Sequence, residues 1–184
     1  GNNTMSYTST FLISNIAPID IKIKERAAME STKILGRRPE NIDRTIELES
    51  PVAVTNLPHP GKRIITNYLM ITDHNDADRR ITNNKISIFT DGSKMDGQTG
   101  AAYIITKNQQ PIDQRKWRLA DHCSVFQAEL FAIKMALLHQ PETTSEIQIF
   151  SDSKSSLDAI KDRTNCHPLV VDINTRIDEL RETG

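Results

Sequence analysis

The stretch "ISIFTDGSK", residues 86–94, begins the part of the chain with the clearest pattern. Residues 86–90 have strand character, and Asp91 and Gly92 follow them directly. Asp91 is therefore expected at the end of a strand, beside the core, where a charge is costly unless it is paired or holds a metal ion. An Asp-Gly pair after a strand is also common in hairpin turns. The importance of Asp91 thus depends on whether the chain supplies partners for it.

The residues around this stretch predict a meander followed by alternating helices and strands. After a glycine-rich turn, two further stretches have strand character, and apolar residues then recur at helical spacing. The expected strands are residues 86–90, 101–106, 114–119 and 147–151, and the expected helices are residues 124–140, 153–162 and 167–180. A helix between two strands places those strands parallel to each other. The predicted fold is α/β, with a mixed sheet of three antiparallel strands plus one parallel strand, and helices on the sheet.

The first part of the chain is different in character. Residues 15–35 predict a helix, because Pro18 suits a first turn and Gly36 stops the pattern. Residues 37–84 are polar and repeatedly interrupted by proline, which indicates an irregular connection with short helical or extended pieces near residues 45–49 and 64–71. We therefore expect residues 1–84 to be a connection segment and residues 85–184 to be a separate domain.

Composition narrows the possible classes of protein. The 184 residues carry 23 Lys and Arg against 24 Asp and Glu, a net charge of −1, which excludes a simple polybasic nucleic-acid binder. Cys123 and Cys166 form no CxxC pair and suggest no disulfide framework, so an intracellular setting is expected, without a choice between nucleus and cytoplasm. No apolar run is long enough to span a membrane. The chain does not begin with Met, so we expect a fragment of something longer.

Three acidic residues are expected to converge. Asp91 and Asp152 each follow a strand, and if these two strands are parallel neighbours their carboxylates are adjacent. Glu129 lies in the first turns of the intervening helix, where the small Ala128 and Ala132 would let the helix approach the sheet. Taken singly, Glu129 also suits the helix dipole and Asp152 suits an N-cap. Together they need a cation or a shared proton, and hard oxygen ligands suit Mg²⁺ or Mn²⁺.

A family resemblance supports this convergence. The stretches "FTDGSK", "FQAEL" and "IFSDSKSSLDAI" resemble, in order and spacing, the first three motifs of type 1 ribonuclease H. The residues in these motifs are most similar to those of the ribonuclease H domains at the end of non-LTR retrotransposon polyproteins. Residues 15–29 resemble the segment that follows the reverse transcriptase in such polyproteins. The resemblance covers the chain from residue 86 to its end and, more weakly, the first helix.

The resemblance implies an activity and a set of roles. The reaction would be hydrolysis of the RNA strand of an RNA–DNA hybrid with two Mg²⁺ or Mn²⁺ ions, and the other partner would be the remainder of a retroelement polyprotein. Asp91 would bridge the two ions, Glu129 would bind one of them, and Asp152 would share in metal binding and in activating water. The residues expected to contact the substrate backbone are Ser93, Gln127 and Ser153.

The chain also departs from the family pattern. That pattern continues with a fifth strand, a histidine-bearing loop and a helix with a fourth acid in a Gly-Asn-Glu-x-Ala-Asp context, whereas this sequence stops at "DELRETG". We therefore expect a truncated domain with impaired activity. Two alternatives stay open: a non-catalytic hybrid-binding or connection module, and another nuclease or integrase of the same fold. The "DGSK" and "QAEL" wording favours ribonuclease H over the second alternative.

Overall fold

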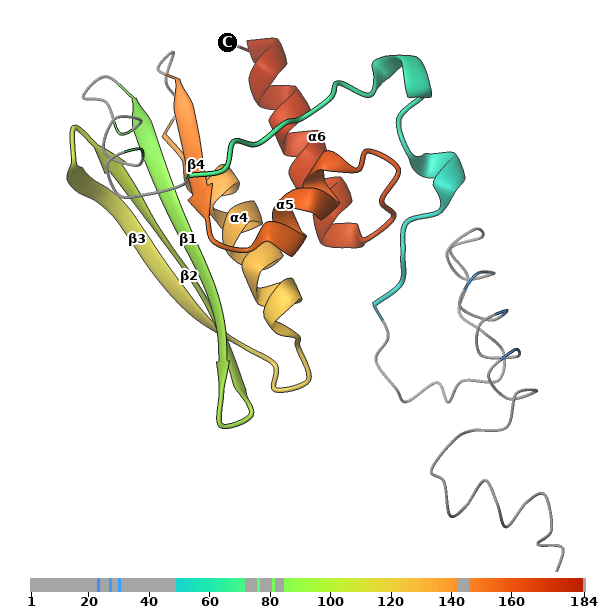
Figure 1. Ribbon diagram of the computed structural model, residues 1–184, viewed down its shortest axis with the longest axis horizontal. Helices are drawn as coiled ribbons and strands as arrows, with labels where there is room; N and C mark the ends of the chain where they lie inside the picture. The colour runs from blue at the N-terminus through green and yellow to red at the C-terminus, as the bar shows by residue number, and fades with distance from the viewer. Residues whose placement is uncertain are drawn as a thin grey trace, which may run out of the picture. The chain divides into compact units, whose positions relative to one another are not determined.

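The computed structural model describes residues 49–71, 85–141 and 146–183, together with Ile23, Ala27, Glu30, Asp76 and Ile81. Within these residues a four-stranded sheet and three α-helices follow two short 3₁₀ helices (Figure 1). The strands are β1 (Ile86–Met95), β2 (Gln98–Lys107), β3 (Gln110–Leu119) and β4 (Ile147–Ser151). The helices are η1 (Val54–Asn56), η2 (Pro60–Lys62), α4 (Val125–His139), α5 (Lys154–Lys161) and α6 (Pro168–Thr183).

The sheet has the mixed topology that the sequence predicts. Its strand order is β3-β2-β1-β4. β1 pairs antiparallel with β2, and β2 pairs antiparallel with β3. β4 pairs parallel with β1, and Ile147 lies opposite Ile86. The α/β fold and the parallel neighbours β1 and β4 are therefore confirmed.

Helix α4 crosses between β1 and β4 and forms the centre of the core. Ala136 packs with Ile88 and Ile105 of the sheet, while Leu130 and Ile133 pack with α5 and α6. The helix lies between the sheet and the other two helices in Figure 1. Because both of its sides are covered, α4 is apolar around much of its circumference instead of along one narrow stripe.

The first hairpin corrects one sequence prediction. Residues 91–100 are not a long turn, since β1 continues through Asp91 to Met95 and pairs with β2 as far as Gln98. The turn itself contains two residues, Asp96 and Gly97, with φ angles of 51° and 76°. Positive φ at both central positions is typical of the tight hairpin turns in which Asp-Gly is favoured. The turn-forming Asp-Gly pair is thus the second one in the stretch, and the first pair lies inside a strand.

The preceding part of the chain is described only in places. Of the helix predicted over residues 15–35, only Ile23, Ala27 and Glu30 are described, and each is helical. Residues 45–48 lie outside the described residues, and residues 64–71 form neither helix nor strand. The contacts divide the chain into two units, Gly1–Asn56 and Leu57–Gly184, whereas the domain boundary before residue 85 stays a prediction. None of the helices in the described part is long and apolar enough to cross a membrane.

Candidate metal and active site

The unequal lengths of β1 and β4 bring two aspartates together. β4 ends at Ser151, which lies opposite Thr90, and β1 continues beyond this point. Asp91 follows Thr90 on β1, and Asp152 follows Ser151. Both side chains are exposed. Asp91 therefore lies within a strand and not at its end, but it lies next to the end of the neighbouring parallel strand.

Helix α4 supplies the third acid because it approaches β1 very closely. Ala101 of the sheet packs with Ala128 and Ala132 of the helix, and all three side chains are buried. A Cβ atom at Gly92 would lie 2.5 Å from the backbone N of Glu129, so only glycine fits there. The predicted close approach through Ala128 and Ala132 is confirmed. It places Glu129 beside the end of β4.

The three carboxylates form one cluster. Asp91, Glu129 and Asp152 each offer a carboxylate oxygen, and the three oxygens all lie within 4.8 Å of one another. Glu129 is only 4% exposed, and burial raises its pKa to about 7, with a further increase from the charges of Asp152 and Asp91. The Gly92 N–H donates a hydrogen bond to the Glu129 carboxylate and lowers that pKa in part. Without a cation, ionisation of Glu129 is therefore unfavourable.

The cluster fits a divalent cation. The Oε2 atom of Glu129 is buried and has no hydrogen-bond partner among the described residues. A bound cation would satisfy that oxygen and offset the repulsion between the carboxylates, and an all-carboxylate donor set suits Mg²⁺ or Mn²⁺. In the described part of the chain, no other group of three His, Cys, Asp or Glu side chains is placed to hold a metal ion. Two acids near the C-terminus are paired with arginines, Asp178 with Arg163 and Glu179 with Arg176.

The three residues expected to contact substrate lie near the acids, and their contacts with a substrate stay predictions. Ser93 is exposed on β1, two residues after Asp91. The Oε1 atom of Gln127 accepts from the Ser124 backbone N–H at 2.8 Å, and Ser124 Oγ accepts from the Gln127 N–H at 3.1 Å. Gln127 therefore helps to begin α4. Ser153 is the residue before α5, and its hydroxyl donates to Ser156 Oγ at 2.8 Å.

Two of the three clustered acids lie on a groove with a volume of about 1810 Å³. Asp91, Asp152 and Lys154 line it at one end, and apolar side chains of β4, α5 and α6 line it together with residues 66–71. The Tyr68 hydroxyl donates to Asp158 Oδ1 at 2.5 Å and fixes those residues to α5.

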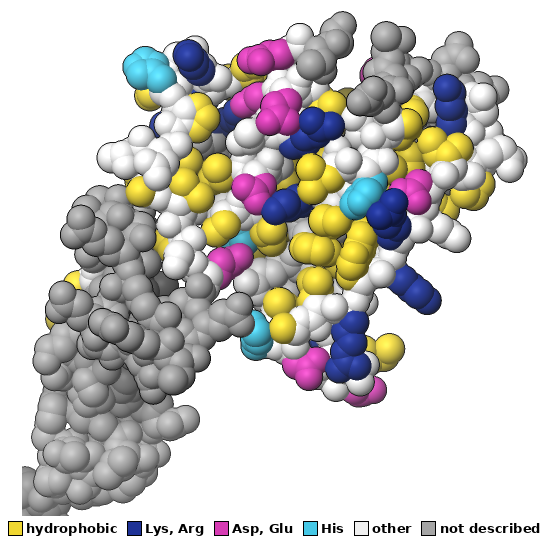
Figure 2. Space-filling model, turned by 180° about the vertical axis from the view of Figure 1, so that it is seen from behind, with side chains coloured by type: hydrophobic (Ala, Val, Ile, Leu, Met, Phe, Trp, Pro, Cys, Tyr) yellow, Lys and Arg dark blue, Asp and Glu magenta, His cyan; other side chains and the backbone are white. Residues whose placement is uncertain are grey.

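On the face shown in Figure 2, which is seen from behind the view of Figure 1, basic and acidic side chains are interspersed between hydrophobic ones. That face carries no broad basic surface among the described residues.

Gly92 is the residue of this site that the sequence analysis did not identify. Its signal was available, because a glycine within a strand often marks a close approach of another backbone. The signal was lost because Asp91 and Gly92 were interpreted as a turn. Once the turn is placed at Asp96 and Gly97, Gly92 falls inside β1, facing α4.

Comparison with known proteins agrees with this geometry. A comparison with curated proteins finds no match. A model of the RNase H family matches residues 83–177, which include all four strands, α4, α5 and the three clustered acids. Since the matched residues make up more than half of the 184, the chain belongs to the ribonuclease H family.

Proposed function

We propose that this chain hydrolyses the RNA strand of RNA–DNA hybrids, with Asp91, Glu129 and Asp152 as the ligands of two Mg²⁺ or Mn²⁺ ions. The observation that carries the proposal is the carboxylate cluster, whose three oxygens lie within 4.8 Å of one another in a chain of the ribonuclease H family. The unpartnered buried oxygen of Glu129 supports the same proposal, because a bound cation would supply the partner that it lacks.

The three acids have different positions and therefore different tasks. Glu129 is buried against β1 and is fixed by the Gly92 N–H, so it forms the rigid inner wall of the site. Asp91 and Asp152 are exposed and face the side from which a nucleic acid can approach. When bound, the cations would lower the pKa of the attacking water and stabilise the leaving 3′ oxygen. Ser93 and Ser153 flank the acids and are proposed to contact the substrate backbone, with RNA distinguished by its 2′-hydroxyls.

We also propose that the chain is part of a retroelement polyprotein that works inside the cell. The residues of the three motifs, and the resemblance of residues 15–29 to the segment after a reverse transcriptase, support the origin in a retroelement polyprotein, the first part of this proposal. The free thiols of Cys123 and Cys166 support the second. Sequencing the coding region around this chain tests the first part. An upstream reverse transcriptase frame is expected, and an unrelated frame there would contradict the proposal.

A cleavage assay tests the activity. End-labelled RNA–DNA hybrid, single-stranded RNA and DNA duplex are each incubated with the protein in Mg²⁺ and in Mn²⁺. We expect cleavage of the RNA strand of the hybrid alone, and its loss when the cations are chelated. Asp152→Asn is expected to lower the rate by at least about a hundredfold, because it removes a ligand charge from the cluster.

Asp96→Asn is the matched control. It makes the same chemical change at the tip of the β1–β2 hairpin, at a turn position with φ of 51° that Asn tolerates as well as Asp. This variant is expected to cut like the parent protein. An Asp152→Asn protein that cuts as fast as the parent would show that the cluster is not catalytic. An intact hybrid in both metals would contradict cleavage by this chain.

A further inference from the structure

We infer that Lys94 and Thr99 are positioning residues for the metal cluster: they clamp the loop before α4 and thereby set where the Glu129 carboxylate lies. This inference rests on the proposed function. The clamp consists of Lys94 on β1, Thr99 on β2 and the backbone carbonyl of Cys123. The hydrogen bonds of the two side chains go to the loop before α4 and not to the three acids.

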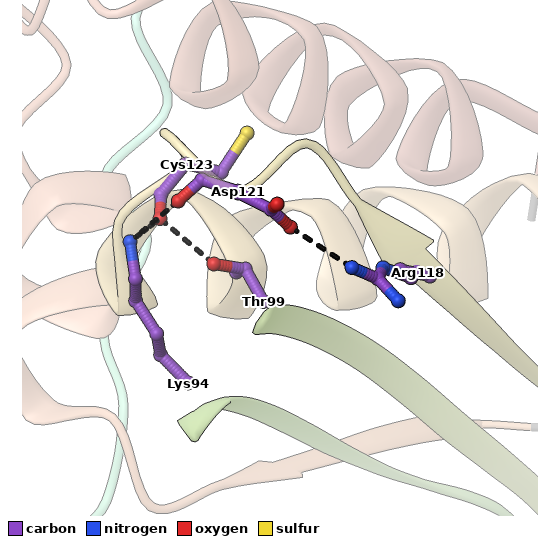
Figure 3. Close-up of polar contacts among 5 residues, drawn as sticks. All are labelled: Lys94, Thr99, Arg118, Asp121 and Cys123. Atoms are coloured by element: carbon purple, nitrogen blue, oxygen red, sulfur yellow. Dashed lines mark hydrogen bonds and ion pairs between the residues drawn. The ribbon is translucent and has the colours of Figure 1, made fainter. Parts of the chain in front are cut away.

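The contacts of the clamp are short and converge on one carbonyl. Lys94 Nζ donates to the Cys123 carbonyl at 2.9 Å and to the Asp121 carbonyl at 2.7 Å. The Thr99 hydroxyl donates to the same Cys123 carbonyl at 2.9 Å. Figure 3 shows the two side chains reaching that carbonyl together, with Asp121 turned toward Arg118. Lys94 and Thr99 can share an acceptor because they lie opposite each other in the β1–β2 pair.

The clamped carbonyl is connected directly to the start of α4. Cys123 precedes Ser124, the N-cap of the helix, and Ser124 and Gln127 form a reciprocal capping box. One turn later, the backbone of Ala128 and Glu129 rests on Gly92. Gly92 and Lys94 lie on the same face of β1, two residues apart, so a single strand holds the helix at two successive points. Two fixed points determine both the axial position and the rotation of the helix, and hence the direction of Glu129.

Helix stability alone does not account for Lys94. A cation near the N-terminus of a helix is opposed by the helix dipole, so the ammonium group is unfavourably placed for α4 itself. Two of its three N–H donors are also used by carbonyls of the loop. A metal ligand, by contrast, has to be held within about 0.5 Å of its productive position. A rigid loop before α4 meets this requirement, even though the ammonium group of Lys94 is unfavourably placed for the helix dipole.

Metal affinity tests the inference without depending on activity. The Kd for Mn²⁺ is measured by titration calorimetry for the parent protein and for Lys94→Met, which keeps the aliphatic stem and removes the donors. We expect the Kd to rise by about tenfold, the lower end of the range for residues that orient metal ligands. Lys94→Arg, which retains donors for both carbonyls, is expected to recover most of the affinity. Excess Mn²⁺ should restore cleavage by Lys94→Met.

A second pair of variants keeps the test decisive if Lys94→Met folds poorly. Thr99→Val removes one donor to the Cys123 carbonyl and should raise the Kd for Mn²⁺, whereas Thr99→Ser should leave it unchanged. Lys107→Met is the matched control, because Lys107 is an exposed lysine at the far end of the same hairpin. Its Kd should equal that of the parent protein.

The outcomes separate this inference from the proposed function. Parent-like Mn²⁺ affinity in folded Lys94→Met would overturn the clamp even if the protein cleaves hybrid. A loss of hybrid affinity without a change in the Kd for Mn²⁺ would also overturn it, since Lys94 would then be a substrate contact. Normal Mn²⁺ affinity in the parent protein without cleavage would overturn the proposed function and leave the clamp intact, provided that Lys94→Met binds the metal less tightly.

Discussion

Gly92 shows how one absent side chain controls the approach of a helix to a strand. A Cβ atom there would lie 2.5 Å from the Glu129 backbone N and 2.8 Å from the Ala128 carbonyl carbon. Both neighbours are backbone atoms, so no side-chain rotation can relieve the contact. The helix would have to move away from β1, and Glu129 would move with it.

The first prediction concerns this position. Gly92→Ala is expected to lower the free energy of unfolding by about 1–3 kcal/mol, as overpacking does, and to weaken Mn²⁺ binding. Gly100→Ala is the control, because a Cβ there would meet its nearest atoms at 3.6 Å and 3.8 Å, which is ordinary contact. Urea unfolding of both variants decides the matter. Equal losses of stability would refute the close-approach argument.

The second prediction concerns the pKa of Glu129, which burial raises to about 7 in the folded protein. The folded state therefore holds this proton more tightly than the unfolded chain does. That contribution to stability is complete below the unfolded pKa of about 4.5 and is lost as the pH rises through about 7. Glu129→Gln keeps the side chain at position 129 neutral at every pH. Without metal, the variant should exceed the parent protein in stability by on the order of 2 kcal/mol at about pH 8.

Urea unfolding at two pH values checks this prediction. The difference between Glu129→Gln and the parent should almost vanish near pH 4, where Glu129 is protonated in both states. With saturating Mn²⁺ at about pH 8 the order should reverse, because only the parent gains stability from the cation. A variant that is less stable than the metal-free parent at both pH values would contradict the assigned cause.

At the scale of elements, the connection between α5 and α6 is held by one buried arginine. The side chain of Arg163 is 8% exposed. It donates to Asn174 Oδ1 at 2.7 Å and pairs with Asp178, both on α6. The arginine thus fixes the loop against two successive turns of the final helix.

The third prediction follows from this contact. Arg163→Met is expected to cost about 3 kcal/mol of stability, because Asp178 would lose its partner in a mostly buried position. The Kd for Mn²⁺ should stay close to that of the parent protein, since neither residue belongs to the acidic cluster. Arg181→Met, at an exposed position in the last turn of α6, is the control and should change the melting temperature little.

The elements also show what the sequence could and could not predict. Periodicity was sufficient for all four strands and three helices, because α4 and α6 repeat apolar residues at helical spacing and the strands are bounded by turn residues. The lengths of β1 and β2 were underestimated, since two Asp-Gly pairs compete for one turn and only the pairing of β1 with β2 distinguishes them. The convergence of Asp91, Glu129 and Asp152 followed from topology. The clamp by Lys94 and Thr99 did not, because it depends on the register that the misplaced turn concealed.

At the scale of the whole molecule, the cluster couples cation binding to global stability. A ligand that binds only the folded state stabilises it by mass action, by about 2.7 kcal/mol at a concentration a hundredfold above its Kd. The fourth prediction is that Mn²⁺ raises the melting temperature of the parent protein in a concentration-dependent way. Asp91→Asn should show a much smaller increase and Asp96→Asn the full one. Equal increases in all three would place the bound ion elsewhere.

The parallel pairing of β1 with β4 also orders events while the protein is made. The β1–β2 hairpin is local and can form within about 1–10 μs, whereas β4 must close a loop from Ile86 to Ile147 before it can pair. Asp91 and Glu129 leave the ribosome first, and Asp152 follows with β4. We expect the nascent chain to stay unable to bind metal until this last strand docks. Cations would then act late in folding, by trapping the docked strand and not by guiding the meander.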